Sequence, residues 1–403
     1  MVSTRGWRGP MQAPRGTDRN RIAVVGGGVA ALEAMLALTE LGAGRQEVEL
    51  VCPQHEFLYR PLAVTEPFDR GEILRFDLRE LTELSGARFQ QQTAVAVEPE
   101  KHRLLLHEGS EVEYDHLLIA VGAKRLWVVP GATTFWAVAG ESEAKGVVEK
   151  VRSGAVRKVI FTMPSGSGWP LPIYELALLM AADVAERRLE VRLSVVTPEE
   201  TPLQLFGLQA GEQVAGLLAN HGIEVITGAH PVSFDGRQLT VAPGAPVDAD
   251  AVITMPRLQG RHLEGIPRDQ NGFIPVDGHC RVPEMDHVFG AGDVTAFPVK
   301  QGGIAAQQAD VAAATIAAEA WGAAQPSPFD PVLRGTLLTG ERTRFLSGRI
   351  SGRHGETSQM SVRPLWQPQG KIFGTRLTPL LSRLAGRPIG VDGEATPGSD
   401  PHP

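Results

Sequence analysis

The chain has 403 residues, of which 42% are apolar and 21% are charged, a composition typical of folded globular proteins that excludes wholesale disorder. Its net charge of −7 argues against a general nucleic-acid-binding role. Only two cysteines occur, Cys52 and Cys280, and they lie far apart in the sequence. This excludes a disulfide scaffold, a cysteine-based zinc or iron–sulfur site, and a CxxC redox pair.

The sequence shows neither a secretory signal nor a membrane span. Residues 1–20 carry four arginines among glycines and prolines without an apolar core, which predicts a disordered leader. The longest apolar stretch, residues 171–182, is far shorter than the roughly 20 residues that span a bilayer. We therefore expect a cytoplasmic protein, either free or bound peripherally to the inner face of the membrane.

The first structural pattern in the chain is a βαβ unit. A buried strand over 22–25 is followed by a helix over 30–41 and a second strand over 48–51. Between the first strand and the helix stands Gly26-x-Gly28-x-x-Ala31, in the place that a dinucleotide-binding loop requires. A turn that merely needs glycines is the weaker alternative.

Each residue of this loop has a physical role in such a site. Gly26 permits the tight turn, Gly28 lets a pyrophosphate approach the backbone, and Ala31 keeps the helix close to the strand. The helix N-terminus at Val29 and Ala30 offers free N–H groups and a positive dipole end.

The end of the second strand departs from the usual fingerprint. An acidic residue normally stands there and binds ribose hydroxyls, but this chain has Cys52 followed by Pro53. Gln54 or His55 could supply the hydrogen bonds instead. We interpret Cys52 itself as a small buried residue without a redox role.

A second nucleotide-like βαβ unit follows, with strands over 159–163 and 191–196 around a helix over 173–187. Its loop contains Gly166 and Gly168 but also prolines, which have no N–H to give a phosphate, and a bulky tryptophan. Those residues are Trp169, Pro170 and Pro172. The loop favours a retained scaffold over a working NAD(P)H site, although NAD(P)H binding stays open as the alternative.

Two later strands also end in small residues. One runs through 114–123 and ends at Ala120-Val121-Gly122, and the other runs through 286–293 and ends at Gly292-Asp293. An alanine-rich helix over 303–321 follows, with its N-terminus at Gly303. That N-terminus would point at whatever Asp293 binds.

Taken in order over residues 21–322, these motifs resemble those of two-dinucleotide-fold FAD proteins, the pyridine nucleotide-disulfide oxidoreductase superfamily. The resemblance implies that the first glycine loop holds the FAD pyrophosphate. It also implies that the 118–122 turn is the Ala-x-Gly motif between the domains, and that Asp293 binds the ribityl chain.

Within that superfamily the chain is most similar to sulfide:quinone oxidoreductases, flavocytochrome c sulfide dehydrogenases and type II NADH dehydrogenases. The segments 57–62 and 297–303 resemble those that lie along the flavin in this group. The sulfide-oxidising enzymes use a pair of active-site cysteines, and neither Cys52 nor Cys280 stands at those positions. The NADH dehydrogenase quinone-side pattern is met only from Gly303 to Gln308.

The resemblance gives a set of expected flavin contacts. Lys300 is a candidate to face the charge that reduction places on the flavin, or else an ordinary surface ion-pairing residue. Glu175 is a proton-relay candidate, or else a helix-terminal acid. The expected catalytic residues are Lys300, Glu175, Tyr59 and Arg60. The expected cofactor contacts are Gly26, Gly28, Val29, Ala30, Ala31, Cys52, Pro53, Arg60, Pro61, Ala120, Val121, Gly122, Gly292, Asp293, Lys300 and Gly303.

Histidine spacing predicts no metal site, since the closest pair, His102 and His107, only flanks a short apolar strand. Residues 371–385 place apolar side chains at near-helical spacing between basic ones. This segment either contacts a membrane peripherally or packs on the protein's own core or on a second copy in a homodimer. The apolar residues are Phe373, Leu377, Leu380, Leu381 and Leu384.

We therefore predict an α/β protein with two Rossmann-like domains. The FAD domain is split over 21–130 and 256–330, the second domain covers 131–255, and a C-terminal region covers 331–403. The expected function is an FAD-dependent oxidoreductase that passes electrons from a small-molecule or protein donor to a quinone or another acceptor. The alternatives are an NAD(P)H:acceptor oxidoreductase and a flavin-binding protein without turnover.

Overall fold

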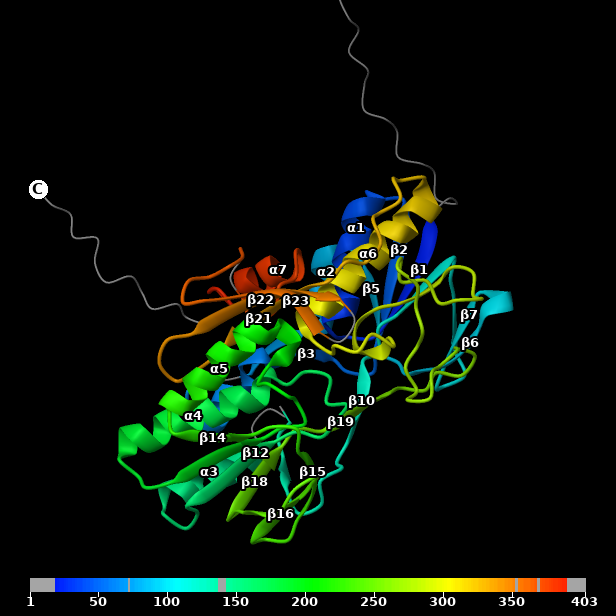
Figure 1. Cartoon of the computed structure of the whole chain (residues 1–403). Coiled ribbons are helices and arrows are strands. Elements are labelled where there is room, and N and C mark those ends of the chain that lie inside the picture. The colour runs from blue at the N-terminus through cyan, green and yellow to red at the C-terminus, as the bar shows by residue number, and fades with distance from the viewer. Residues whose placement is uncertain (1–18, 72, 137–142, 352–353, 368–369, 390–403) are drawn as a thin grey trace, which may run out of the picture.

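The computed structural model describes residues 19–71, 73–136, 143–351, 354–367 and 370–389 (Figure 1). The expected leader and the last residues of the C-terminal region lie outside these ranges. The first sheet has five parallel strands in the order β20-β9-β1-β2-β5. Their bounds are β1 Asn20–Val25, β2 Gln46–Val51, β5 Arg88–Gln90, β9 His116–Ile119 and β20 Val288–Gly290.

Both faces of the first sheet are covered, which explains why its central strands are apolar throughout. Ile22 and Val24 pack on one face against the alanine-rich helices α1 (Val29–Gly42) and α6 (Gly302–Trp321), which lie side by side (Figure 1). Ala23 and Val25 pack on the other face against an antiparallel sheet. That sheet consists of β6 Ala94–Glu98, β7 Arg103–Leu106 and β8 Glu111–Glu113.

The second sheet repeats this design, with five parallel strands in the order β11-β18-β12-β13-β14. The antiparallel pair β10 (Ala123–Leu126) and β19 (Arg257–Gly260) carries the chain from the first sheet to the second and back. The division into 21–130 with 256–330 and 131–255 remains our proposal for the domain boundaries. The strands are β11 Thr133–Thr134, β12 Lys158–Thr162, β13 Arg192–Val196, β14 Ile223–Ile226 and β18 Ala251–Thr254, and the helices are α3 Glu143–Arg152, α4 Leu171–Arg187 and α5 Leu208–Asn220.

Smaller elements complete the two halves. The antiparallel strands β15 (His230–Phe234), β16 (Gln238–Ala242) and β17 (Val247–Asp248) cover the face of the second sheet that carries Ile160 and Val252. The remaining elements are β3 Glu56–Tyr59, β4 Leu74–Asp77, α2 Leu78–Ser85 and the short 3₁₀ segments η1 Arg60–Phe68, η2 Pro99–Lys101, η3 Gln204–Phe206 and η4 Gly292–Val294.

The C-terminal region packs against both halves. Its antiparallel sheet, β21 (Val332–Leu337), β22 (Arg344–Ser351) and β23 (His354–Ser361), shares a core with α4. The chain then returns to the first half through α7 (Leu377–Leu384), whose residues join the core of α1 and α6. Leu377 and Leu381 of α7 do so, together with Ile372, which precedes the helix.

The buried side of α7 supports internal packing for the amphipathic segment. Leu377 and Leu381 are buried, and Glu33 of α1 accepts hydrogen bonds from the backbone N–H groups of Arg376 and Leu377 at 2.7 and 2.8 Å. Pro379 falls in the first turn of α7, where no intrahelical N–H is required. Membrane contact and dimerisation stay predictions, and none of the helices in the described ranges is long and apolar enough to cross a membrane.

The fold class predicted from the sequence is confirmed. The strands and helices of both βαβ units appear within two residues of their predicted bounds, because each depends on a local apolar run closed by glycine or proline. The helix predicted to begin at Gly303 begins at Gly302. The amphipathic segment is helical only over the eight residues of α7.

Candidate cofactor-binding site

A cavity of about 900 Å³ opens at the carboxyl ends of the first sheet's strands. This is the edge at which open α/β sheets bind ligands. Its walls come from the first glycine loop, the segment after β2, η1, the turn after β9, η4 and the start of α6. The loop before α4 and residues of β21 and the C-terminal segment complete the enclosure.

The first glycine loop leaves this cavity open at the N-terminus of α1. Gly26 has φ of +130°, and a Cβ there would lie 2.3 Å from the carbonyl oxygen of Ala120, so only glycine fits. Gly28 is the N-cap of α1, carries no capping side chain, and has no protein atom within 4 Å of where its Cβ would be. Free N–H groups and open space at one point form a cradle for a phosphate group.

Cys52 does not face the cavity. Its side chain is fully buried in the core of the first half, and its thiol donates to Gln54 Oε1 at 3.1 Å. A Cβ on Gly27 would lie 2.6 Å from its sulfur, so Cys52 packs tightly behind the glycine loop. Pro53 and Gln54 line the cavity in its place. The side chain of Cys52 therefore fits the interpretation of a small buried residue.

Asp293 also lines the cavity, in η4 directly after β20. Its turn lies beside the start of α1, since a Cβ on Gly292 would be 3.0 Å from the Cβ of Ala30. Gly292 has φ of +81°, and its N–H donates to Gln308 Oε1 at 2.8 Å, which fixes this turn. Burial raises the pKa of Asp293, while the positive charges of Lys300 and Arg60 act in the opposite direction. A carboxylate held this way can accept hydrogen bonds from hydroxyl groups.

Lys300 is buried beside Asp293 and lines the cavity. Its ammonium donates to the carbonyl oxygen of Thr295 and lies 3.8 Å from the centre of the Phe273 ring. Burial lowers the pKa of Lys300 to about 8, although Asp293 opposes the shift. The sequence alternative of a surface ion pair does not match this position. Sequence reasoning also missed Gln301, the α6 N-cap, whose Oε1 accepts from Ile304 N at 2.9 Å.

Glu175 and Lys371 form a buried ion pair on the cavity wall. Lys371 Nζ lies 2.7 and 2.8 Å from the two carboxylate oxygens of Glu175, and both side chains are at most 5% exposed. Lys371 also donates to the carbonyl oxygen of Pro61 at 2.9 Å, and Glu175 accepts from the N–H of Leu338 at 2.9 Å. Burial raises the pKa of Glu175 and lowers that of Lys371, and each partner opposes the other's shift.

Basic side chains stand at another part of the cavity wall. The guanidinium groups of Arg60 and Arg125 lie 5.3 and 4.0 Å from the centre of the Trp136 ring. Burial lowers the pKa of both, and the repulsion of Arg60 and Arg261 lowers that of Arg125 further. Across the described ranges, no salt bridge joins Arg60, Arg125 or Arg261 to a carboxylate. This wall is suited to anionic groups.

Fourteen of the eighteen residues that the sequence predicted for the site line this one cavity, although they come from six separate segments. The exceptions are Ala31, Cys52, Tyr59 and Gly303. Tyr59 is 1% exposed, its hydroxyl donates to the carbonyl oxygen of Ile389 at 3.0 Å, and burial raises its pKa. Tyr59 thus anchors the C-terminal segment, and its neighbour Arg60 points into the cavity.

The second glycine loop closes over the same cavity. Ser167, Trp169 and Pro172 line it from the side of the second sheet. The N–H of Lys300 donates to the carbonyl oxygen of Gly168 at 3.1 Å, and a Cβ on Gly168 would lie 2.5 Å from Cγ of Lys300. The loop therefore packs against the first half of the protein.

The acid at the end of β13 is also engaged within the protein. Glu199 stands where a ribose-binding acid would follow the second strand of a nucleotide fold. It is 7% exposed, and its Oε2 accepts hydrogen bonds from the hydroxyl groups of Tyr174 and Thr197 at 2.5 and 3.2 Å. Burial raises its pKa to about 7. Glu199 is therefore a buried residue whose hydrogen bonds connect segments within the second half.

The sequence matches the family profile of the pyridine nucleotide-disulphide oxidoreductases over residues 20–160 and 174–315, which is well over half of the chain. The chain belongs to this family. The match does not include residues 161–173, which contain the second glycine loop.

Individual family members are distant relatives. Rhodocoxin reductase of Rhodococcus erythropolis is 28% identical over 304 residues, which cover 69% of this chain and 65% of that protein, so the match spans just under two thirds of its length. An NADH dehydrogenase-like protein of Mycobacterium tuberculosis is 25% identical, covering 68% of this chain and 73% of that one. The structure of the sulfide:quinone oxidoreductase of Aquifex aeolicus superposes with a TM-score of 0.75 at 20% identity, covering 85% of this chain and 87% of that one.

Membership of this oxidoreductase family is consistent with a cavity that is lined by the first glycine loop. The two cysteines of the chain both lie outside its lining. Cys280 is buried, its thiol lies 3.4 Å from the carbonyl oxygen of Gln308, and burial raises its pKa to about 12. Neither thiol is placed to react with a group in the cavity, because the reactive form of a cysteine is the accessible thiolate.

Proposed function

We propose that the cavity binds FAD without a covalent bond and that the protein is an FAD-dependent oxidoreductase. One observation carries this proposal. The glycine cradle at the N-terminus of α1 and the turn that carries Asp293 lie side by side in the lining of one cavity, and Lys300 and the start of α6 line the same cavity. This arrangement fits a ligand in which a diphosphate is followed by a polyol and a flat ring.

Individual residues would hold individual parts of FAD. The N–H groups at Gly28 and Val29 would bind the diphosphate, and Asp293 would accept a hydrogen bond from a ribityl hydroxyl. Lys300 and the N-terminus of α6 would place positive potential beside the ring. When bound, FAD supplies two-electron redox chemistry between a donor and an acceptor.

The buried pair Glu175–Lys371 is our candidate for proton movement at this site. Both groups line the cavity, and both are removed from bulk solvent. In a site of low dielectric, a carboxyl group and an amine 2.7 Å apart can exchange one proton between them. The hydrogen bond from Lys371 to the carbonyl oxygen of Pro61 would hold the proton-carrying ammonium at the cavity wall.

NAD(P)H is disfavoured as the donor. Pro170 and Pro172 remove N–H groups at the N-terminus of α4, Trp169 packs against Phe206 with ring centres 5.9 Å apart, and Glu199 already accepts internal hydrogen bonds. Sulfide oxidation through a cysteine pair is disfavoured because both thiols are buried away from the cavity. We therefore propose a different small reductant or a protein as the donor.

The acceptor is a quinone or a small redox protein. Relatives whose names specify a quinone and rhodocoxin as partners support these two classes. The basic wall formed by Arg60, Arg125 and Arg261 would suit an acidic redox protein. The alternative functions are an NAD(P)H:acceptor oxidoreductase, supported by the NADH dehydrogenase-like relative, and a flavin-binding protein without turnover.

A donor screen without oxygen tests the proposal. The purified protein should be yellow and release FAD on denaturation. Stopped-flow mixing with NADH, NADPH and sulfide should leave the flavin band largely oxidised, and repeated reduction of a quinone or dye should occur with another donor. A colourless protein that cannot be reconstituted with FAD would refute the proposal. Fast bleaching by micromolar NADH would instead favour the NADH dehydrogenase alternative.

A further inference from the structure

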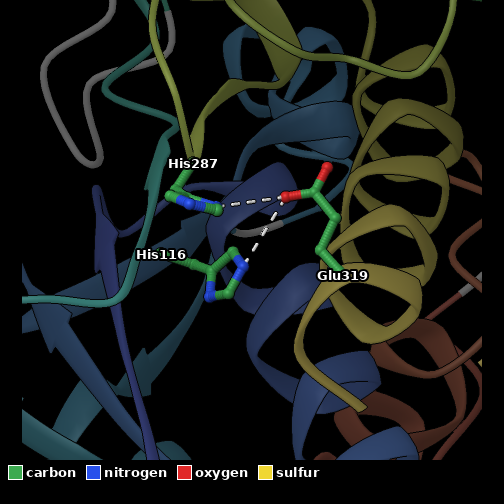
Figure 2. A group of neighbouring side chains, drawn as sticks. All are labelled: His116, His287 and Glu319. Atoms are coloured by element: carbon green, nitrogen blue, oxygen red, sulfur yellow. Dashed lines mark hydrogen bonds and ion pairs between the residues drawn. The ribbon is translucent and has the colours of Figure 1, made fainter. Parts of the chain in front are cut away.

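Three side chains with metal-binding groups meet at the edge of the first sheet that lies opposite the cavity. His116 is the first residue of β9, His287 directly precedes β20, and Glu319 lies in the last turn of α6 (Figure 2). One nitrogen from each histidine and one oxygen of Glu319 all lie within 4.8 Å of one another. The two imidazole rings meet edge to face, with their centres 4.9 Å apart.

His116 is the unusual member of this cluster. Its side chain is only 5% exposed, and its Nδ1 lies 2.7 Å from Asn20 Oδ1, at the start of β1. With Nδ1–H donating to that oxygen, Nε2 carries the lone pair. Nε2 is buried and has no hydrogen-bond partner among the described residues. A buried acceptor without a partner is costly, so something should satisfy it.

Glu319 cannot satisfy this nitrogen by itself. Its Oε2 lies 3.6 Å from His116 Nε2, and a carboxylate oxygen has no proton to donate. With the ring proton on Nδ1 facing Asn20, the Nε2 lone pair faces this oxygen, so two acceptors lie next to each other. A cation between the two atoms turns this repulsion into attraction.

The distances match those around a small metal ion. Oε2 of Glu319 lies 3.6 Å from His116 Nε2 and 3.4 Å from His287 Nδ1 (Figure 2). Zinc bonds to nitrogen and oxygen of about 2.0–2.2 Å separate neighbouring tetrahedral ligands by about 3.3–3.6 Å. Both separations from Glu319 therefore match a tetrahedral ion, and the two histidine nitrogens lie within 4.8 Å of each other. The side chain of His287 is half-exposed, which leaves access for water to complete the shell.

Neighbouring residues hold two of the three ligands in place. Asn20 fixes the tautomer and the plane of His116. Arg281 Nε donates to Oε1 of Glu319 at 2.8 Å and leaves Oε2 for the histidines. Metal sites in proteins commonly orient their histidine and carboxylate ligands through such partners.

We propose that His116, His287 and Glu319 bind one divalent transition-metal ion of the zinc type. The ion would join the C-terminal turn of α6 to strands β9 and β20. Because the site lies at the opposite edge of the sheet from the cavity, its role is structural: it fixes the helix whose N-terminus forms part of the cavity wall. It does not depend on the proposed redox function.

Zinc titration of the full-length protein tests this site. After EDTA treatment and buffer exchange, isothermal titration with zinc chloride should show one equivalent bound per chain at micromolar affinity or tighter, and zinc should raise Tm. The His287→Ala variant should bind at least about tenfold more weakly and lose the Tm increase. Its exposed position means that folding should survive, which circular dichroism without zinc verifies.

His107→Ala is the matched control, because His107 is an exposed histidine on a neighbouring strand connection. This variant should bind zinc as the wild type does. Wild-type protein without saturable zinc binding, or equal affinities for wild type and His287→Ala, would overturn the proposal. The flavin content of each sample is measured separately, so loss of FAD cannot be mistaken for loss of metal.

Discussion

The two glycine loops of this protein lie at equivalent points of two βαβ units, yet they differ in what meets the N-terminus of the following helix. At the first loop, α1 begins at a glycine without a capping side chain, and the space in front of Gly28 is open. At the second, α4 follows Pro170, and the loop contacts Lys300. The match to the family profile also leaves out the second loop.

Two βαβ units with the same backbone arrangement therefore need not both offer a phosphate-binding site. The open first loop leaves N–H groups for a phosphate. The second loop has prolines in that position, and protein atoms cover it. Its helix is anchored by Lys371 of the C-terminal region, whose ammonium pairs with Glu175. The second glycine loop and the start of α4 thus form part of the wall of the cavity at the first sheet.

The strongest test of this difference removes the anchor of α4. Lys371→Met leaves the buried carboxyl group of Glu175 without its cation, and we expect unfolding free energy to fall by about 3–5 kcal/mol. The double variant Glu175→Gln with Lys371→Met should recover a large part of this loss, because no unpaired charge remains. Urea denaturation measures both. Equal losses in the single and double variants would show that the pair is not what holds α4.

A matched pair of glycine variants compares the loops directly. Gly26→Ala and Gly166→Ala both place a side chain at positive φ, a cost of about 1–3 kcal/mol each. At Gly26 the new Cβ also meets the backbone carbonyl of Ala120 at 2.3 Å, whereas at Gly166 it meets only the flexible side chain of Arg257 at 3.2 Å.

We therefore expect Gly26→Ala to be less stable than Gly166→Ala by a further 1–3 kcal/mol or so. It should also retain less FAD, while Gly166→Ala should keep its FAD. Thermal unfolding and flavin absorbance report the two effects. If both variants lose FAD equally, the second loop contributes to the cofactor site more than we propose.

Asp293→Ala tests the carboxylate that lines the cavity beside the first glycine loop. Removing this carboxylate should cost a charge-assisted hydrogen bond of about 1.5–3 kcal/mol, which weakens FAD binding by roughly 10–150-fold. Equilibrium dialysis of the apoprotein with FAD measures this change. Asp293→Asn is the control, since its amide oxygen still accepts a hydrogen bond, and it should lose less affinity than the alanine variant.

The smallest effects are expected at the cysteines. Cys52→Ser and Cys280→Ser should leave flavin reduction by the true donor unchanged within about twofold, because both thiols lie outside the cavity and burial raises the pKa of each. Anaerobic stopped-flow reduction measures the rate. A sulfide reaction that disappears in either variant would contradict the cavity argument and restore a cysteine mechanism.

The sequence determined the parts of this protein whose causes are local. The strand, the glycine turn and the helix of each βαβ unit follow from short apolar runs closed by glycine or proline. The contrast between the two loops follows as well, because proline removes an N–H group wherever it stands. The cavity contacts predicted at Gly26 and Gly28 depend on the same local rules, whereas the role expected of Asp293 came from the resemblance to the family.

Only the tertiary structure decided which distant side chains meet. Lys371 lies 196 residues from Glu175, and nothing in its local pattern of basic and apolar residues points to that carboxylate. Tyr59 and Arg60 are adjacent in sequence, yet Tyr59 ends β3 with its side chain in the core, while Arg60 begins η1 and lines the cavity. His116, His287 and Glu319 have no metal-binding spacing and come together because β9 and β20 begin, and α6 ends, at the same edge of the sheet. Such meetings depend on sheet order and helix packing, which arise from contacts across the whole chain.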